Sequence, residues 1–229
     1  MKRIALVLLA ALLIAPMAAQ AGRGNRVHNG CSLAGLVTEL PTQNLREKEI
    51  KDLLYMREEE KLARDVYLSL YEQWDLRVFR QIAKAERNHM AALGVLIDKY
   101  ELVDPVGDNP LGVFTNQKLQ SLYEDLSAAG SASLVGALQV GAAIEDVDIY
   151  DLQRSLERTN NEDVQVVYQN LMKGSRNHLR AFTRLLERYG ESYEPVYLSP
   201  NEYQEILDSP REKGVVDADG ELLCGGGKR

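Results

Sequence analysis

Four long stretches of this chain repeat apolar residues every three or four positions, which is the spacing of one face of an α-helix. We expect these helices at about residues 45–74, 76–100, 133–158 and 162–189. Nowhere between the two ends does the sequence alternate apolar and polar residues for long, as a half-buried strand would. The spacing therefore predicts an all-α fold built on four long helices.

The lengths of the connections predict how these helices are arranged. Only a few residues near Asp75 separate the first two helices, and a few near Asn160 separate the last two, so each pair should form an antiparallel hairpin. About thirty residues, 101–132, join the hairpins and include a short helical segment around 117–126. Two hairpins joined by one long crossover form a ferritin-like antiparallel four-helix bundle. We expect this bundle, with a C-terminal strap and one more short helix, to span residues 44–208.

The two ends of the chain have a different character. Residues 1–21 combine a basic start, an apolar run and a small-residue cleavage site, which is the anatomy of a secretory signal peptide; an uncleaved N-terminal anchor is the alternative. Cleavage would give an exported protein, periplasmic or secreted, that has no membrane segment. We expect residues 22–43 to form a mobile arm and residues 209–229 a disordered tail.

Charge and cysteine content exclude several classes of protein. A net charge of −7 and the lack of a basic run argue against a nucleic-acid partner. The two cysteines, Cys31 and Cys224, do not form a Cys-x-x-Cys pair, which excludes a zinc ribbon, a rubredoxin-type iron site and a thioredoxin-type motif. In an oxidising compartment they could pair as a disulfide between the two ends of the mature chain, or have no such role.

Each helical stripe is interrupted near its middle by polar residues, and nearly all of them are of types that bind metal ions. A buried carboxylate without a partner costs several kcal/mol, so these interruptions need a reason. Mid-helix positions in two antiparallel hairpins lie at similar heights, and the side chains could therefore converge. We predict a metal site formed by Glu60, Glu86, His89, Glu145, Asp148 and His178.

The ligand types indicate which metal would bind. Glu86 and His89 are three residues apart and share one helix face, and such pairs on facing helices build carboxylate-bridged two-metal sites. Oxygen-rich ligation with imidazole suits iron or manganese, and four carboxylates would balance two divalent ions. The competing interpretations are that Glu60 pairs with Arg64, that Glu86 faces solvent and that Asp148 turns outward.

Three segments resemble ligand segments of rubrerythrins, which belong to the ferritin-like superfamily. They are Glu60-Lys-Leu-Ala-Arg-Asp-Val-Tyr67, Ala85-Glu86-Arg-Asn-His89 and Gly141-Ala-Ala-Ile-Glu145. With Gly174-Ser-Arg-Asn-His178, the pattern over about residues 45–190 also resembles a family of domains of unknown function in that superfamily. The resemblance implies a ferritin-like bundle with a metal centre.

The fourth helix departs from the rubrerythrin pattern, because Ser175 stands where that pattern has a glutamate. One bridging carboxylate is therefore missing. Asp148 could replace its charge, the site could hold a single ion, or metal binding could be lost. We also expect the small residues Gly174 and Ser175 to leave a gap that admits water, oxygen or peroxide.

The leading functional hypothesis is an exported non-haem oxidoreductase of the oxidase or peroxidase kind. Its centre would hold two iron or manganese ions, its oxidant would be oxygen or peroxide, and an external partner would donate electrons. Tyr67 lies on the same stripe, either as a core residue or as a donor to the site. The alternatives are a protein that binds or buffers metal without turnover, and a metal-free helical interaction module.

Overall fold

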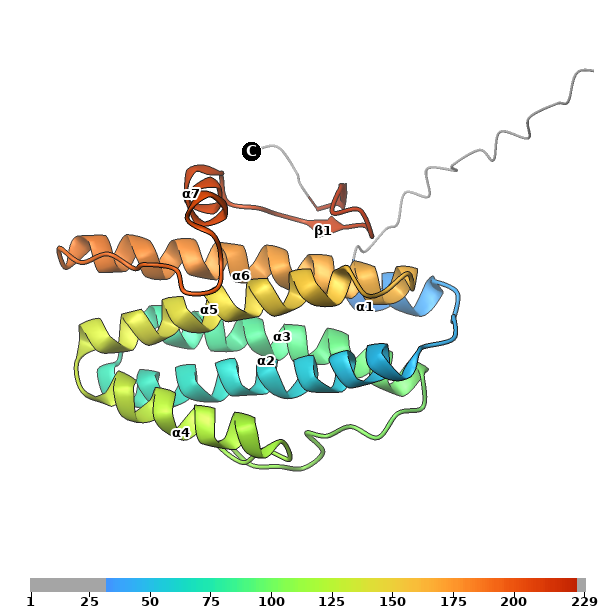
Figure 1. Ribbon diagram of the computed structural model, residues 1–229, viewed down its shortest axis with the longest axis horizontal. Helices are drawn as coiled ribbons and strands as arrows, with labels where there is room; N and C mark the ends of the chain where they lie inside the picture. The colour runs from blue at the N-terminus through green and yellow to red at the C-terminus, as the bar shows by residue number, and fades with distance from the viewer. Residues whose placement is uncertain (1–31, 226–229) are drawn as a thin grey trace, which may run out of the picture. The chain divides into compact units, whose positions relative to one another are not determined.

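The computed structural model describes residues 32–225, and within this range the chain forms seven helices and one two-stranded sheet (Figure 1). The four long helices are α2 (Glu47–Trp74), α3 (Arg77–Lys99), α5 (Leu134–Leu156) and α6 (Glu162–Arg188). Each begins and ends within a few residues of the bounds that periodicity predicts. The all-α prediction is confirmed for the described part of the chain. No helix there is long and apolar enough to cross a membrane.

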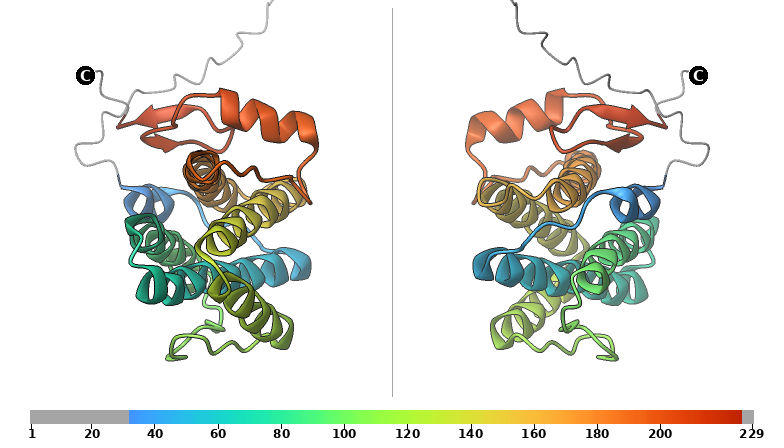
Figure 2. Two further views of the ribbon diagram at one scale, coloured as in Figure 1. Left: turned by 90° about the vertical axis from the view of Figure 1, so that its left-hand side faces the viewer. Right: turned by 90° about the vertical axis from the view of Figure 1, so that its right-hand side faces the viewer.

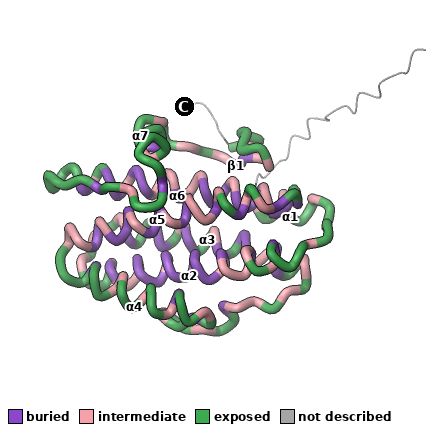
Figure 3. Tube along the Cα trace, in the orientation of Figure 1, coloured by how far each residue is buried: buried purple, intermediate pink, exposed green. Residues whose placement is uncertain are grey.

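The long helices pack in sequential pairs, α2 along α3 and α5 along α6, with further contacts between α3 and α6 and between α2 and α5. The turn between α2 and α3 is tight because Asp75 adopts a left-handed conformation, with φ 47°. Asp52 pairs with Arg158 beyond the end of α5, whereas Tyr67 contacts Gly141 near its start, so α2 and α5 run antiparallel. Buried positions concentrate along these four helices (Figure 3).

The crossover between α3 and α5 contains α4 (Gln117–Ser131), which packs against α2 and α5. The predicted short helix is thus confirmed, although it extends further than expected. A fully buried ion pair in α2, Lys61 Nζ to Asp65 Oδ2 at 2.5 Å, holds the irregular part of this segment. Lys61 Nζ donates to the Pro110 carbonyl at 2.8 Å, and Asp65 accepts from the Gly112 amide at 2.9 Å.

The predicted mobile arm is partly wrong, because residues 33–39 form α1 (Leu33–Glu39). This helix packs against α3 and α6 (Figure 2) and buries Val37 completely. Lys99 Nζ donates hydrogen bonds to the carbonyls of Val37 and Leu40, at 3.0 and 2.9 Å. The predicted signal peptide, residues 1–21, and Cys31 lie outside the described residues, so export and a disulfide to Cys224 stay predictions.

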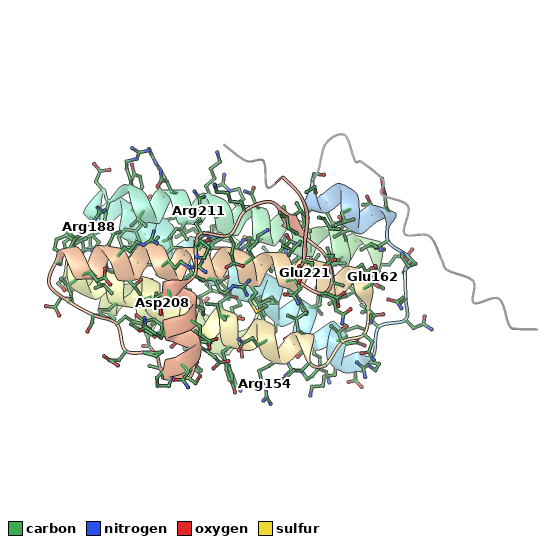
Figure 4. All side chains as sticks on the ribbon, turned by 90° about the horizontal axis from the view of Figure 1, so that it is seen from above. Arg154, Glu162, Arg188, Asp208, Arg211 and Glu221 are labelled. Atoms are coloured by element: carbon green, nitrogen blue, oxygen red, sulfur yellow. The ribbon has the colours of Figure 1, made fainter. Side chains whose placement is uncertain are left out.

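The C-terminal region also contains more structure than we expected. The predicted short helix is present as α7 (Pro200–Asp208). Residues 209–225 of the predicted disordered tail contain an antiparallel pair of strands, β1 (Val215–Val216) and β2 (Leu222–Cys224). Asn170 of α6 exchanges two hydrogen bonds with the backbone of Val216, at 2.8 and 3.0 Å, and so fixes β1 against the helix. Figure 4 looks onto this side, with Glu162 and Arg188 at the two ends of α6.

The strap between α6 and α7 is held by one buried carboxylate on α5. Asp146 accepts four hydrogen bonds, from the Tyr193 hydroxyl at 2.8 Å and from the amides of Val196, Tyr197 and Leu198 at 2.6, 3.1 and 2.9 Å. Asp146 precedes Asp148 by only two residues, yet its side chain points to a different side of α5. Its burial therefore has a structural reason that is separate from the candidate metal site.

Candidate metal centre

The acids and histidines that interrupt the helical stripes lie inside the protein, near the middle of the long helices. Glu60 belongs to α2, Glu86 and His89 to α3, Glu145 and Asp148 to α5, and His178 to α6. All the carboxylates of this set are at most 5 % exposed, and both histidine side chains are 12 % exposed. The alternatives that placed Glu86 and Asp148 towards solvent are therefore wrong. Arg64 pairs with Asp65 rather than with Glu60.

Glu86 lies between the two imidazole rings. Its Oε2 atom is 2.7 Å from Nδ1 of His89, and its Oε1 atom is 2.9 Å from Nδ1 of His178. The ring centroids are 5.7 Å apart and the ring planes differ by 29°. One carboxylate thus faces a nitrogen ligand from its own helix, α3, and another from α6.

A further glutamate completes each side of this arrangement. Glu60 Oε2 is 3.1 Å from His89 Nδ1, and Glu145 Oε2 is 3.4 Å from His178 Nδ1. Two groups of candidate ligands result, Glu60 with Glu86 and His89, and Glu86 with Glu145 and His178, and within each group the ligand atoms lie within 4.8 Å of one another. Because Glu86 belongs to both groups, the arrangement could hold two ions bridged by a carboxylate.

Several buried polar atoms of the cluster lack a hydrogen-bond partner among the described residues. They are Glu60 Oε1, Glu86 Oε1, Asp148 Oδ1 and His178 Nδ1. Although Glu86 Oε1 and His178 Nδ1 are close, their orientation does not make a hydrogen bond. Buried polar atoms are normally satisfied, and each exception costs about 1–3 kcal/mol. A cation bound between these atoms would remove that cost, so the donor set fits a metal ion.

The pKa values of the metal-free cluster also indicate that its buried negative charges need a compensating positive charge. Burial raises the pKa of Glu60 to about 8, although the charge of His89 opposes this shift. Burial alone would lower the pKa of His178, but the charges of Glu86 and Glu145 outweigh it and raise that pKa to about 10. Burial and then the charge of Glu86 raise the pKa of Glu145. In the absence of metal, protons on imidazole and carboxyl groups supply the charge that a cation would otherwise bring.

Asp148 lies beside the two ligand groups without belonging to either. Its carboxylate accepts a hydrogen bond from the Ser175 hydroxyl. Burial, and then the charges of Glu60 and Glu145, raise the pKa of Asp148 well above its usual value. Ser175 of α6 therefore holds an aspartate from the neighbouring helix next to the cluster.

The gap that we expected at Gly174 and Ser175 is filled by protein atoms. A β-carbon at position 174 would overlap the imidazole ring of His89, so this ring occupies the space that the glycine leaves. Ser175 is completely buried and, besides contacting Asp148, lies 3.1 Å from the Leu171 carbonyl. The small residues make room for a candidate ligand rather than for a small molecule.

Tyr67 joins the cluster to the aromatic core. Its hydroxyl donates a hydrogen bond of 2.5 Å to Glu145 Oε1 and lies 3.3 Å from the Gly141 carbonyl. Its ring packs against Phe79 and Phe182, with centroid distances of 6.4 and 5.4 Å. A hydroxyl group thus holds one of the candidate ligands from the side that the aromatic rings cover.

One buried acid of this region, Glu59, was not predicted from the sequence. It is 5 % exposed, and its Oε2 atom has no hydrogen-bond partner within the described range. Burial, followed by the charges of Asp148 and Asp151, raises the pKa of Glu59 well above its usual value. The only signal in the sequence is the run of three glutamates at positions 58–60, which by itself resembles a solvated helix surface.

The chain is similar to proteins of one known family. A family model described as "Uncharacterized protein domain (DUF2202)" matches residues 49–210, which include all six predicted ligands. The chain is 51 % identical over 179 residues to the uncharacterized protein MJ0754 of Methanocaldococcus jannaschii, covering 78 % of this chain and 97 % of that protein. The crystal structure of hypothetical protein MJ0754 from Methanococcus jannaschii is similar with a TM-score of 0.75 and 53 % identity, covering 76 % of this chain and 99 % of that one. The chain therefore belongs to the DUF2202 family.

Proposed function

We propose that this chain is a ferritin-like four-helix bundle that binds two iron or manganese ions through carboxylates and imidazoles. The observation that carries the proposal is the position of Glu86, whose two carboxylate oxygens face His89 Nδ1 and His178 Nδ1 at 2.7 and 2.9 Å. The sequential pairing of α2 with α3 and of α5 with α6, joined through α4, supports the bundle.

Each ion would be held by one of the two ligand groups, and Glu86 would contribute to both. Glu60 and His89 would hold the first ion, and Glu145 and His178 the second. Asp148, held by Ser175, would lie close enough to contribute its charge. With Asp148 included, four carboxylates would balance two divalent ions, and the oxygen-rich ligand set favours iron or manganese over metals that prefer thiolates.

Iron or manganese bound here would supply electrons to oxygen or peroxide, which is oxidase- or peroxidase-type chemistry. The protein's own contribution would be to hold the ligands and to limit access of water. Tyr67 fixes Glu145 by its hydrogen bond of 2.5 Å, and Phe79 and Phe182 cover that side of the cluster. An external partner would restore the reduced state. We further propose that the mature protein is exported, which N-terminal sequencing of the protein isolated from its native compartment would test.

Elemental analysis of the purified protein tests the metal centre. We expect two ions per chain in the wild type, and loss of both in Glu86→Ala, because both ligand groups share Glu86. Glu58→Gln is a suitable control, since Glu58 is likewise a buried acid but belongs to α2 and accepts hydrogen bonds from the backbone of Thr115 and Asn116. Equal metal contents in the wild type and in Glu86→Ala would contradict the site.

A second measurement separates the three functional hypotheses. An absorbance change when oxygen or peroxide is added to the reduced, metal-loaded protein would support the oxidoreductase. Stoichiometric metal without such a change would favour a buffering role. Protein that contains no metal after isolation from its native compartment, and that takes up none when iron or manganese is added, would leave only the interaction module.

A further inference from the structure

The contact between α2 and α5 contains two acidic residues, Glu59 and Asp151, that the proposed centre does not use. The register of this contact is fixed at two points, by the Asp52–Arg158 ion pair at 2.9 Å and by the Tyr67–Glu145 hydrogen bond at 2.5 Å. In this antiparallel register Glu59 of α2 lies opposite Asp151 of α5. Asp148 is three residues before Asp151 and therefore shares its face of α5.

These acids are buried to different degrees. Glu59 and Asp148 are each 5 % exposed, whereas Asp151 is only partly buried. Glu59 Oε2 and Asp148 Oδ1 have no hydrogen-bond partner in the range that the structure describes. The nearby guanidinium of Arg158 makes its ion pair with Asp52 instead. Two buried carboxylates with unsatisfied oxygens, close to a third, are stable as a group only if protons or a cation neutralise them.

The outer end of this contact is accessible to solvent. Asp52 and Tyr55 lie on the same face of α2 as Glu59, at intervals of three and four residues. Both residues line a surface pocket of about 450 Å³. Inward from this end, the partly exposed Asp151 lies beside Glu59, and Glu59 lies near Asp148 next to the cluster.

We propose that Asp151, Glu59 and Asp148 form an entry path along which divalent metal ions reach the centre. The inference rests on the proposed function, because a path requires a centre to fill. No histidine contributes to these three positions, and Asp151 keeps contact with solvent, so an ion would bind here more weakly than between the imidazoles. Successive weak sites let an ion enter and also leave towards the stronger site.

The rate of metal uptake tests this path. Metal-free protein is mixed with excess Co²⁺ in a stopped-flow instrument, and the absorbance of bound cobalt is followed to completion. We expect Glu59→Gln and Asp151→Asn each to slow uptake about tenfold, since focused negative charge raises the arrival rate of cations by 10–10³. The final cobalt content should stay at the wild-type value. Glu72→Gln removes one charge from an exposed position of the same helix and should leave the rate unchanged.

The outcomes separate this inference from the proposed function. Wild-type rates in both variants would overturn the entry path, as would a lower final cobalt content, because Glu59 would then be a resident ligand. Wild-type protein that binds no cobalt, iron or manganese would contradict the proposed function itself, and the entry path with it. If circular dichroism shows that Glu59→Gln does not fold, Asp151→Asn decides the question alone, since its partly exposed position tolerates an amide.

Discussion

The imidazole ring of His89 on α3 lies against the backbone of Gly174 on α6, in the space that a β-carbon at position 174 would need. A glycine inside a helix costs about 1 kcal/mol relative to alanine. Here the cost has a specific reason, because the close approach sets the position of His89 Nδ1, 3.1 Å from Glu60 and 2.7 Å from Glu86.

Gly174→Ala should therefore displace His89 and weaken metal binding. We expect at least a tenfold loss of affinity, about 1.4 kcal/mol, measured by competition with a chromophoric chelator. Gly94→Ala is the matched control, since a β-carbon at position 94 would lie 3.8 Å from Arg57, an ordinary contact. That variant should gain about 0.5–1 kcal/mol in free energy of unfolding and keep its metal affinity. Equal affinities in the two variants would contradict the role of Gly174.

Tyr67→Phe should destabilise the metal-free protein by about 1–3 kcal/mol, because the buried carboxylate of Glu145 would lose a hydrogen-bond donor. The measurement is the free energy of unfolding in urea with a chelator present. Tyr168→Phe provides a close control, since Tyr168 is equally buried but its hydroxyl has no hydrogen-bond partner among residues 32–225. We expect Tyr168→Phe to be neutral or stabilising. A similar loss in both variants would show that the hydrogen bond to Glu145 is unimportant.

In the metal-free protein, the free energy of unfolding should fall as the pH rises. The pKa of His178 is raised from 6.5 to about 10. The stabilisation that this protonated histidine adds to the free energy of unfolding is therefore complete below pH 6.5 and is lost as the pH approaches 10. Burial raises the pKa of Glu60 from 4.5 to about 8, so the folded state holds that proton more tightly than the unfolded chain, which acts in the same direction. Thermal unfolding of chelator-treated protein between pH 6 and pH 10 should therefore give a steadily falling midpoint.

Metal binding should also release protons, because Glu60 and His178 must lose theirs to become ligands. At pH 7 we expect more than one proton per chain, measured by calorimetry in buffers of different ionisation enthalpy. Glu58→Gln should release the same number, since Glu58 lies outside both ligand groups. Binding without proton release would mean that these two groups do not bind the ions.

Asp146→Ala should be among the most destabilising single changes, because three backbone amides of the strap and the Tyr193 hydroxyl would lose their acceptor. We expect a loss of more than about 3 kcal/mol in free energy of unfolding. Asp146→Asn keeps one acceptor oxygen and should lose less. The metal content of the folded fraction should be unchanged, and a parallel loss of metal would show that the strap also supports the site.

The sequence was most informative where regular helices decide the geometry. The interrupted stripes led to Glu60, Glu86, His89, Glu145 and His178, which the structure brings together. Helical period and short turns between paired helices were sufficient, because they fix both the face and the height of a side chain. The helical stripe placed Asp148 correctly near this group, but the hydrogen bond from Ser175 depends on how closely α5 and α6 approach.

Buried polar residues that bind irregular segments could not be predicted in this way. Lys61, Asp65 and Asp146 are buried because their partners are backbone groups of the crossover and the strap. The sequence does not fix the path of these segments, and the same residues would be solvated if it differed. Glu59 was missed for a related reason, since only the approach of α5 turns that part of α2 into an interior surface.

Glu86 belongs to both ligand groups and lies where the two helical pairs of the molecule meet. Glu86 belongs to the α2–α3 pair, whereas His178 and Glu145 belong to the α5–α6 pair, and each pair is assembled from neighbouring parts of the chain. Cations at this junction would tie the pairs to each other. In their absence, protons on the imidazoles and acids take over this role. When rising pH removes those protons, repulsion among the acids acts across the same boundary, and the first partial opening should separate one pair from the other while each remains helical.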